Sequence, residues 1–282
     1  MERRRPPLVE DLIYSVLKDA LSSENKAIID CFGITFIRQL INSTRYSSSV
    51  FNIIMNDPPC FKGYPSGNYL KQIAKVLELW SQNSQFPIKY TPLSGFSTEI
   101  TQKELESLSH IPECIANLLT YISDSSALTL AESLLISLGP RGILFCLGVR
   151  RTQGSTDKYM IPQRSIIEKA FSQLYSKEES KSSSNLSVGA RSLTKHAHRS
   201  SEGFWGKITG TDNMKNNTAQ DILRRLLNEA AWVNVHCLPN EEAILEIRVS
   251  QGYGARWIIE KKNFRGFVEP MMEGGHEKGW KH

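Results

Sequence analysis

Apolar residues recur with a helical period through most of the first 175 residues. The stretch LVEDLIYSVLKDAL, from residue 8, repeats them every three or four positions, and KAIIDCFGITFIRQLI, from residue 26, is apolar nearly all round. The first pattern is typical of an amphipathic helix and the second of a buried one. Similar periods recur at NYLKQIAKVLELW, ALTLAESLLISLGP and PQRSIIEKAFSQLY. We therefore predict a mainly helical domain over residues 1–176.

Two interruptions break this helical pattern. NDPPCFKGYPSG, residues 56–67, is dense in Pro and Gly and predicts a loop. The apolar runs ILFCLGVRR and DKYMIP flank the polar TQGST, which favours one β-hairpin inside the helical domain. Between these interruptions, ALTLAESLLISLGP is expected to end at Gly139 and Pro140, because Gly permits a left-handed cap and Pro cannot continue a helix.

A polar stretch then separates two parts of the chain. KEESKSSSNLS, residues 177–187, consists of charged residues and serines with a single apolar residue. Such a stretch buries too little apolar surface to offset the entropy lost on ordering, so we predict a flexible linker. The linker would divide the helical domain, 1–176, from a C-terminal domain, 188–282.

Beyond this linker the hydrophobic period changes from helical to alternating. TAQDILRRLLNEAA predicts a helix with Thr218 as its N-cap. Four runs of alternating apolar and polar residues follow, joined by short turns: WVNVHCL, EAILEIRVS, ARWIIE and NFRGFVE. They predict an antiparallel β-meander packed on one or two helices. The whole chain is thus expected to be an α+β protein.

Composition narrows the setting of this fold. The hydrophobic share of 40% and the charged share of 22% are ordinary for a globular protein. No uninterrupted apolar run is long enough to cross a bilayer, so we expect no membrane partner. The five cysteines are odd in number and form no CxxC pair, which favours reduced thiols in the cytoplasm or nucleus. Most of the net charge of +5 comes from residues 181–282, with 15 basic and 11 acidic side chains.

Strand alternation predicts a polar surface on the meander. Successive side chains of a strand point to opposite faces, so Leu245 faces the core while Glu246 and Arg248 face away from it. Aligned register would gather on one face Asn234, His236, Glu246, Arg248 and Arg256, joined from the last strand by Arg265 and Glu269. This face is either simply solvated or binds an anion through its arginines.

Further ligand-binding candidates lie outside the strands. They are Lys195, His196, His198 and Arg199 in the run KHAHR, Tyr253 between two glycines in GYGARW, and His276 and Lys278 in the final GGHEKGWKH. Trp280 in that last run favours a C-terminus that folds back and packs at the sheet edge or site mouth, and the alternative is a disordered tail. Residues two apart do not share a helix face, and the chain holds no HExxH, P-loop or GxGxxG motif. We therefore predict no metal site, and the sequence identifies no cofactor.

Three functions fit these features. We favour a binding module for a phosphate-bearing ligand, either single-stranded nucleic acid or a small phosphorylated molecule, because basic side chains mingle with aromatic rings on which bases stack. The helical domain would then bind a protein partner. One alternative is a hydrolase or phosphoryl-transfer enzyme, with or without a metal ion, whose catalytic candidates are His236, Glu246, His276 and Glu277. The other alternative is a structural adaptor.

Overall fold

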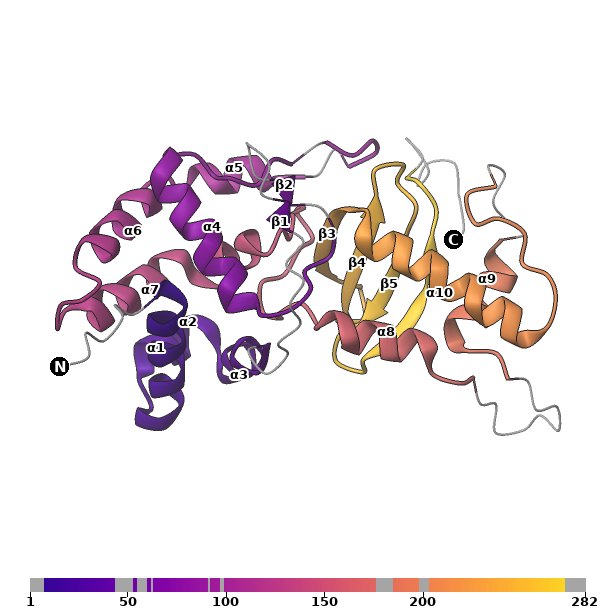
Figure 1. The fold of residues 1–282 in the computed structure, drawn as a ribbon, viewed down its shortest axis with the longest axis horizontal. Coiled ribbons are helices and arrows are strands. Elements are labelled where there is room, and N and C mark those ends of the chain that lie inside the picture. Colours follow the sequence, from indigo (N-terminus) through magenta and orange to yellow (C-terminus); the bar gives the residue numbers. More distant parts are fainter. Residues whose placement is uncertain are drawn as a thin grey trace.

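The computed structural model describes residues 8–43, 53–54, 60–61, 63–90, 92–96, 99–175, 185–197 and 203–271. Helices fill one end of the long axis, and a sheet with its covering helices fills the other (Figure 1). The first group of elements is α1 Val9–Ser23, α2 Lys26–Phe32, α3 Ile34–Asn42, β1 Ile53–Ile54, β2 Cys60–Phe61, α4 Tyr69–Asn83, α5 Thr101–Glu106, α6 Ile111–Thr120 and α7 Ala127–Cys146. The second group is α8 Arg164–Ser172, α9 Val188–His196, α10 Asp212–Asn228, β3 Ala230–Cys237, β4 Ala243–Val249, β5 Gly254–Ile258 and β6 Asn263–Val268.

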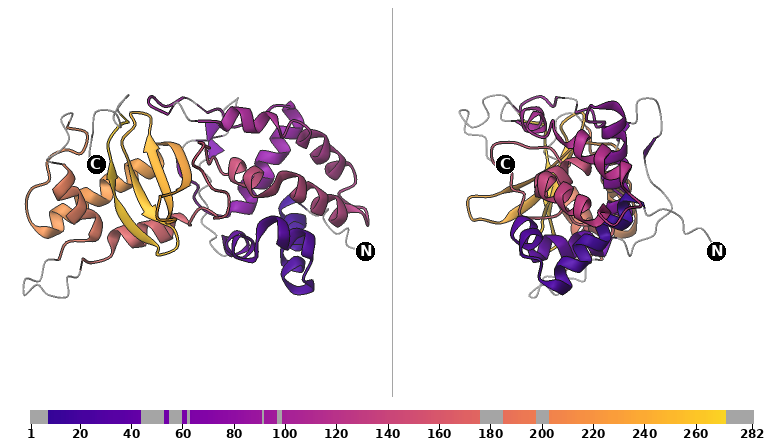
Figure 2. Two further views of the ribbon diagram at one scale, coloured as in Figure 1. Left: turned by 180° about the vertical axis from the view of Figure 1, so that it is seen from behind. Right: turned by 90° about the vertical axis from the view of Figure 1, so that its left-hand side faces the viewer.

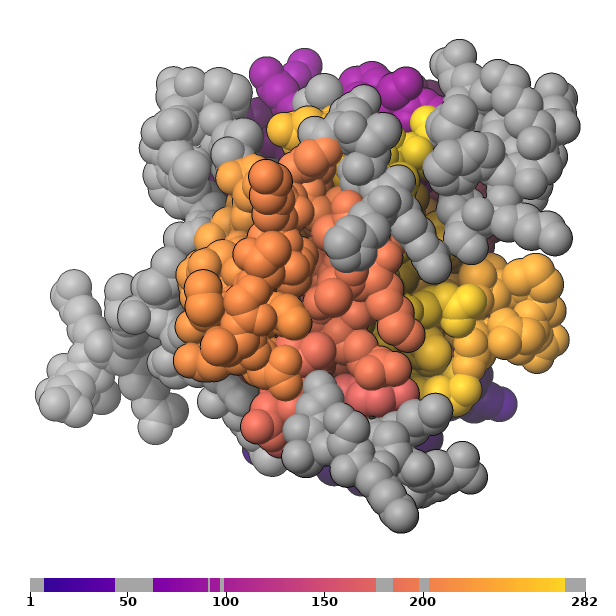
Figure 3. All heavy atoms as spheres, turned by 90° about the vertical axis from the view of Figure 1, so that its right-hand side faces the viewer, coloured from indigo at the N-terminus to yellow at the C-terminus, as the bar shows by residue number. Residues whose placement is uncertain are grey.

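The predicted α+β class and the predicted meander are confirmed. The strands pair antiparallel in the order β3-β4-β5-β6. Helices α8 and α9 contact β6, and α10 contacts β4. Figure 3 views the molecule from the end that holds the sheet, and there α10, in orange, lies beside α8 and α9, in salmon. The apolar side chains on the face that holds Val235, Leu245 and Trp257 are buried beneath these helices, as the alternation predicts.

Glycines set two breaks in the helical part. Gly33, with φ of 74°, ends α2 and begins α3, so the apolar stretch from residue 26 forms two helices instead of one. Gly139 has φ of 59° inside α7, where the helix was expected to stop. The helix resumes at Pro140 because the fixed φ of proline suits the first turn of a helix.

The hairpin predicted around TQGST is wrong. Residues 143–146 belong to α7 and are buried in the helical core. A short apolar run does not distinguish a buried helix from a buried strand, which explains the error. The loop that follows does contact the sheet, because the N–H groups of Arg150 and Thr156 donate to the carbonyls of Val233 and Val235 at 2.7 and 2.9 Å. Residues 150–156 therefore extend the sheet beyond β3.

Helix α7 is long and apolar enough, by length and composition alone, to cross a membrane. Its axis is broken at Gly139, and it packs against α1, α2, α4 and α6. Packing against four neighbouring helices is typical of a core helix. The expected absence of a membrane partner stays a prediction.

Helix α8 lies inside the predicted helical domain but contacts α9, α10 and β6. Its Phe171 packs edge-on against Phe264, with ring centroids 4.8 Å apart. Residues 185–187 of the predicted linker are held in place: Ser187 caps α9 through the Ala190 N–H, and its own N–H donates to the Asn216 side chain at 2.9 Å. The division at 177–187 stays a prediction.

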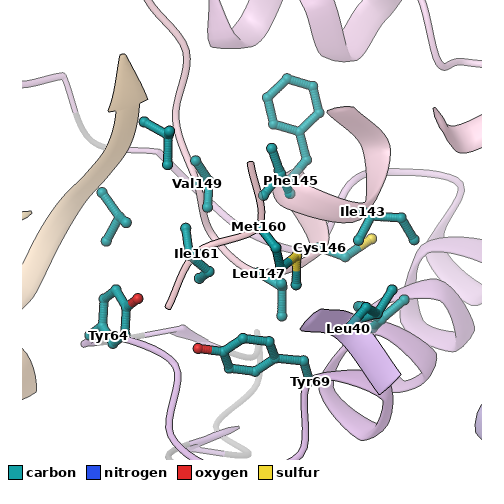
Figure 4. Close-up of a cluster of buried hydrophobic side chains, with 14 of the residues drawn as sticks. Leu40, Tyr64, Tyr69, Ile143, Phe145, Cys146, Leu147, Val149, Met160 and Ile161 are labelled. Atoms are coloured by element: carbon teal, nitrogen blue, oxygen red, sulfur yellow. The ribbon is translucent and has the colours of Figure 1, made fainter. Parts of the chain in front are cut away.

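A buried cluster joins the helical part to the sheet part. The hydroxyls of Tyr64 and Tyr69 both donate to the carbonyl of Pro162, and Figure 4 shows the two rings beside Leu147 and Ile161. The Tyr64 N–H donates to the last turn of α10, at the carbonyl of Leu227. The sheet is thus fastened to the helices by packing as well as by hydrogen bonds.

Candidate active site

The site lies on the face of the sheet turned away from α8, α9 and α10, which we call the outer face. Figure 2, left, shows the sheet from this side. The pairing register aligns rows of side chains across it: Trp232, Arg248, Gly254 and Val268 in one row; Asn234, Glu246, Arg256 and Gly266 in the next; and His236, Ile244, Ile258 and Asn263 in the third. The structure therefore brings together five of the residues that alternation predicted to share a face, namely Asn234, His236, Glu246, Arg248 and Arg256, but not Glu269.

Glu246 is the centre of this face and is only 2% exposed. Arg248 Nε donates to Glu246 Oε1 at 2.5 Å, and Arg256 Nε donates to Oε2 at 2.6 Å. Burial raises the pKa of Glu246, but the charges of the two arginines outweigh it and hold the pKa below its ordinary value. The carboxylate therefore stays ionised. A simply solvated polar face is excluded here, since Glu246 and Arg248 are both buried.

The two arginines that bind Glu246 differ in how many guanidinium donors remain available to a ligand. Arg248 is 2% exposed, and its Nη1 also donates to the carbonyls of Gly252 and Glu269 at 2.5 and 2.7 Å. The side chain of Arg256 is 24% exposed, and among the described residues its guanidinium bonds to Glu246 alone. Arg248 thus holds the structure together, whereas Arg256 has nitrogens free to contact an anion.

His236 stands next to this ion pair. Its Nε2 lies 3.8 Å from Glu246 Oε2, the oxygen that Arg256 also uses. Burial lowers the pKa of His236, Glu246 opposes this effect, and the charges of Arg256, Arg248 and Arg265 lower the pKa further. The imidazole is consequently neutral at pH 7 and able to accept a proton.

Asn234 lies on the same face but is fully used inside the protein. It is 1% exposed, its Oδ1 accepts from the Ser155 hydroxyl at 2.7 Å, and its Nδ2 donates to Thr152 Oγ1 at 3.3 Å. Ser155 also forms an isolated β-bridge with His236. Asn234 therefore positions the loop instead of binding a ligand, and sequence reasoning missed both loop partners by assigning TQGST to a hairpin turn.

Two other candidates lie on the helix-covered side of the sheet. Tyr253 is 4% exposed and stacks on Phe204, with ring centroids 4.0 Å apart. His196 Nε2 lies 2.6 Å from Glu269 Oε1, which also accepts from Trp205 Nε1 at 2.8 Å. Neither residue joins the cluster around Glu246, and Glu269 belongs to this side as well.

The remaining candidates lie at the margins. Lys195 is exposed on α9, and Arg265 is exposed near Glu242. Outside the described residues lie His198, Arg199, His276, Glu277 and Lys278, together with the C-terminal run expected to pack on the sheet. Within the described ranges, no three His, Cys, Asp or Glu side chains are grouped so as to hold a metal ion.

Comparison with known families gives one match. Residues 175–269 match the model of the CdiA C-terminal tRNase toxin domain, a range of 95 of the 282 residues that begins after α8 and includes α9, α10 and β3 to β6. No curated protein and no solved structure matches the chain.

This match corrects the favoured function. A tRNase toxin domain is a nuclease, so the prediction of a simple phosphate-binding module is wrong. The prediction of a nucleic-acid ligand agrees with the match. The error arose because an arginine and a histidine on a sheet face fit phosphate binding and phosphate chemistry equally well in the sequence. The predicted protein partner of the helical part is still only a prediction.

Proposed function

We propose that the sheet part of this protein is a ribonuclease that cleaves RNA by internal phosphoryl transfer, with tRNA as the first substrate to test. The observation that carries the proposal is the convergence of a neutral histidine and a partly free arginine on one buried carboxylate, Glu246. The family match over residues 175–269 supports the choice of RNA.

RNA carries its own nucleophile beside each phosphate, the ribose 2′-hydroxyl. In the proposed reaction, His236 accepts the 2′-hydroxyl proton while the 2′-oxygen forms a bond to phosphorus. The bond from phosphorus to the 5′-oxygen breaks, and that oxygen takes a proton from solvent. The products are a 2′,3′-cyclic phosphate and a 5′-hydroxyl, and no further reactant is consumed.

Arg256 would stabilise the charge that develops on the phosphate in this step. Its Nε is fixed by Glu246 Oε2, which leaves the outer nitrogens of the guanidinium directed by a buried anchor. Pre-oriented donors of this kind stabilise a transition state without reorganising at the moment of reaction. Glu246 and Arg248 would act as positioning residues, since neither is exposed enough to meet substrate.

The test is cleavage of end-labelled tRNA by the full-length protein, followed by analysis of the product ends. We expect a 2′,3′-cyclic phosphate, and no cleavage where a 2′-O-methyl group replaces the 2′-hydroxyl. His236→Ala should lower the rate about 10²–10⁴-fold, the usual contribution of a general base. Arg256→Ala should lower it about 10²–10³-fold, as for other oxyanion-stabilising donors.

Matched controls come from the same chain. His110 is an exposed histidine at the start of α6, and Arg224 is an exposed arginine on α10 that pairs with Asp221. Alanine at either position should leave cleavage unchanged. Full activity in His236→Ala, or products ending in 3′-hydroxyls, would overturn the proposal.

A further inference from the structure

Strand β6 carries a β-bulge directly beside the candidate active site. Arg256 pairs with Gly266, but its neighbour Trp257 pairs with Phe264, so Arg265 is the extra residue. A bulge redirects the side chain of the extra residue. The side chain of Arg265 is 43% exposed, which makes it more accessible than either arginine bound to Glu246.

Arg265 is only loosely held by its neighbours. Its Nη1 lies 3.6 Å from Glu242 Oε2, too far for a hydrogen bond. The other oxygen of Glu242 accepts from Lys261. This carboxylate is ionised, because the hydrogen bond from Lys261, followed by weaker contributions, lowers the pKa of Glu242. Arg265 is thus paired with an anion that it can exchange for another.

Arg265 also lies beside Arg256, because its neighbour Gly266 pairs with Arg256 across β5 and β6. Its charge is one of those that act on His236. Gly266 places no side chain in the row beside Arg256. Ile258, half-buried in the row below, offers an apolar surface on the same face. The surface of the sheet between Arg256 and the bulge therefore carries no large side chain from β6.

We propose that Arg265 binds a second phosphate of the RNA strand, next to the phosphate held by Arg256, and that Glu242 competes with that phosphate for Arg265. This inference rests on the proposed function and extends it to the substrate. A single phosphodiester flanked by two nucleosides would engage Arg256 alone. Longer single strands would engage both arginines and bind more tightly.

Binding is measured with a 2′-O-methyl RNA oligonucleotide, which the full-length protein cannot cleave, by fluorescence anisotropy at several salt concentrations. Arg265→Ala should weaken binding and reduce the slope of log K against log[salt] by about 0.7, the value for one phosphate contact to a single strand. Glu242→Gln should tighten binding, because the competing carboxylate is neutralised. In the double variant this gain should disappear, because the proposal assigns it to Arg265 and not to Lys261.

Lys261→Ala is the matched control, because it removes an exposed positive charge that contacts the same Glu242. It should leave the salt slope unchanged. An unaltered slope in Arg265→Ala, or a gain from Glu242→Gln that persists without Arg265, would refute the second phosphate site. Failure of the proposed ribonuclease would look different: the oligonucleotide would bind as described while unmodified RNA stayed intact.

Discussion

The outer face of the sheet pairs His236 with Glu246, and the helix-covered side pairs His196 with Glu269. His196 lies 2.6 Å from its carboxylate, edge-on to Trp205, and Trp205 donates to the same oxygen. His236 lies 3.8 Å from a carboxylate that two arginines already engage. The first pair is in hydrogen-bond contact and is packed against an aromatic ring. In the second pair the histidine is too far from the carboxylate for a hydrogen bond, so its Nε2 can accept a proton. The same two residue types thus form a structural pair on one side and the proposed catalytic pair on the other.

The largest effect should come from removing the buried charge at the centre of the outer face. Glu246→Gln leaves Arg248 inside the protein without its counter-charge, which typically costs about 3–5 kcal/mol. We expect a markedly lower midpoint in urea unfolding of the full chain and no cleavage of RNA.

Glu269→Gln is the matched variant on the other side of the sheet. No arginine side chain pairs with the Glu269 carboxylate among the described residues, and glutamine can still accept from Trp205. Its cost should be clearly smaller than that of Glu246→Gln. Equal losses from the two variants would mean that the arginines do not distinguish the two faces.

The next largest effect on stability should come from replacing His196, the histidine on the helix-covered side. His196→Ala removes a contact to a charged group, and such hydrogen bonds contribute about 1.5–3 kcal/mol. The expected result is lower stability with an unchanged cleavage rate. His236→Ala should give the converse, with cleavage lost and stability little altered. If His196→Ala abolished cleavage at full stability, the roles given to the two faces would be reversed.

The division into faces could be read from the sequence, because strand alternation separates Leu245 and Ile247 from Glu246 and Arg248 within a single run. The burial of the polar face could not be read in the same way. It depends on Phe96, Thr152 and Ser155, which come from segments far away in the chain. Alternation gives direction, but only tertiary packing decides whether a polar face meets water.

Local sequence patterns did not predict the start of α10 or the role of Gly254. Helix α10 begins at Asp212 with Thr211 as its N-cap, so the predicted N-cap Thr218 is wrong. The first turns of the helix are polar and carry no hydrophobic period, and the sequence pattern therefore did not show them. The run GYGARW lies between two predicted strands and holds the ligand candidate Tyr253. In the structure, a Cβ at Gly254 would lie 2.0 Å from the carbonyl oxygen of Ile247, so the absent side chain serves close strand pairing.

The pH dependence should also separate the two functions of the outer face. His236 has a pKa lowered from 6.5 by burial, so the unfolded chain binds its proton more readily. Its contribution to stability is therefore complete above pH 6.5 and is lost as the pH falls below that value. Glu246 has a pKa lowered from 4.5, so its contribution is lost only below pH 4.5. In the proposed reaction cleavage needs neutral His236, so its rate should fall on the acid side below pH 6.5, before Glu246 titrates.

The smallest expected effect is a displacement of that acid limb. Arg265 is the last of the charges that lower the pKa of His236, after Arg256 and Arg248. Arg265→Ala should therefore raise the pKa of His236 slightly and move the acid limb of kcat to higher pH. Lys261→Ala removes an equal charge that is not among the main ones acting on His236, so the acid limb of this variant should move less. Equal shifts of the acid limb in both variants would mean that the pKa of His236 depends on net charge alone. The positions of the arginines on the outer face would then have no specific effect on His236.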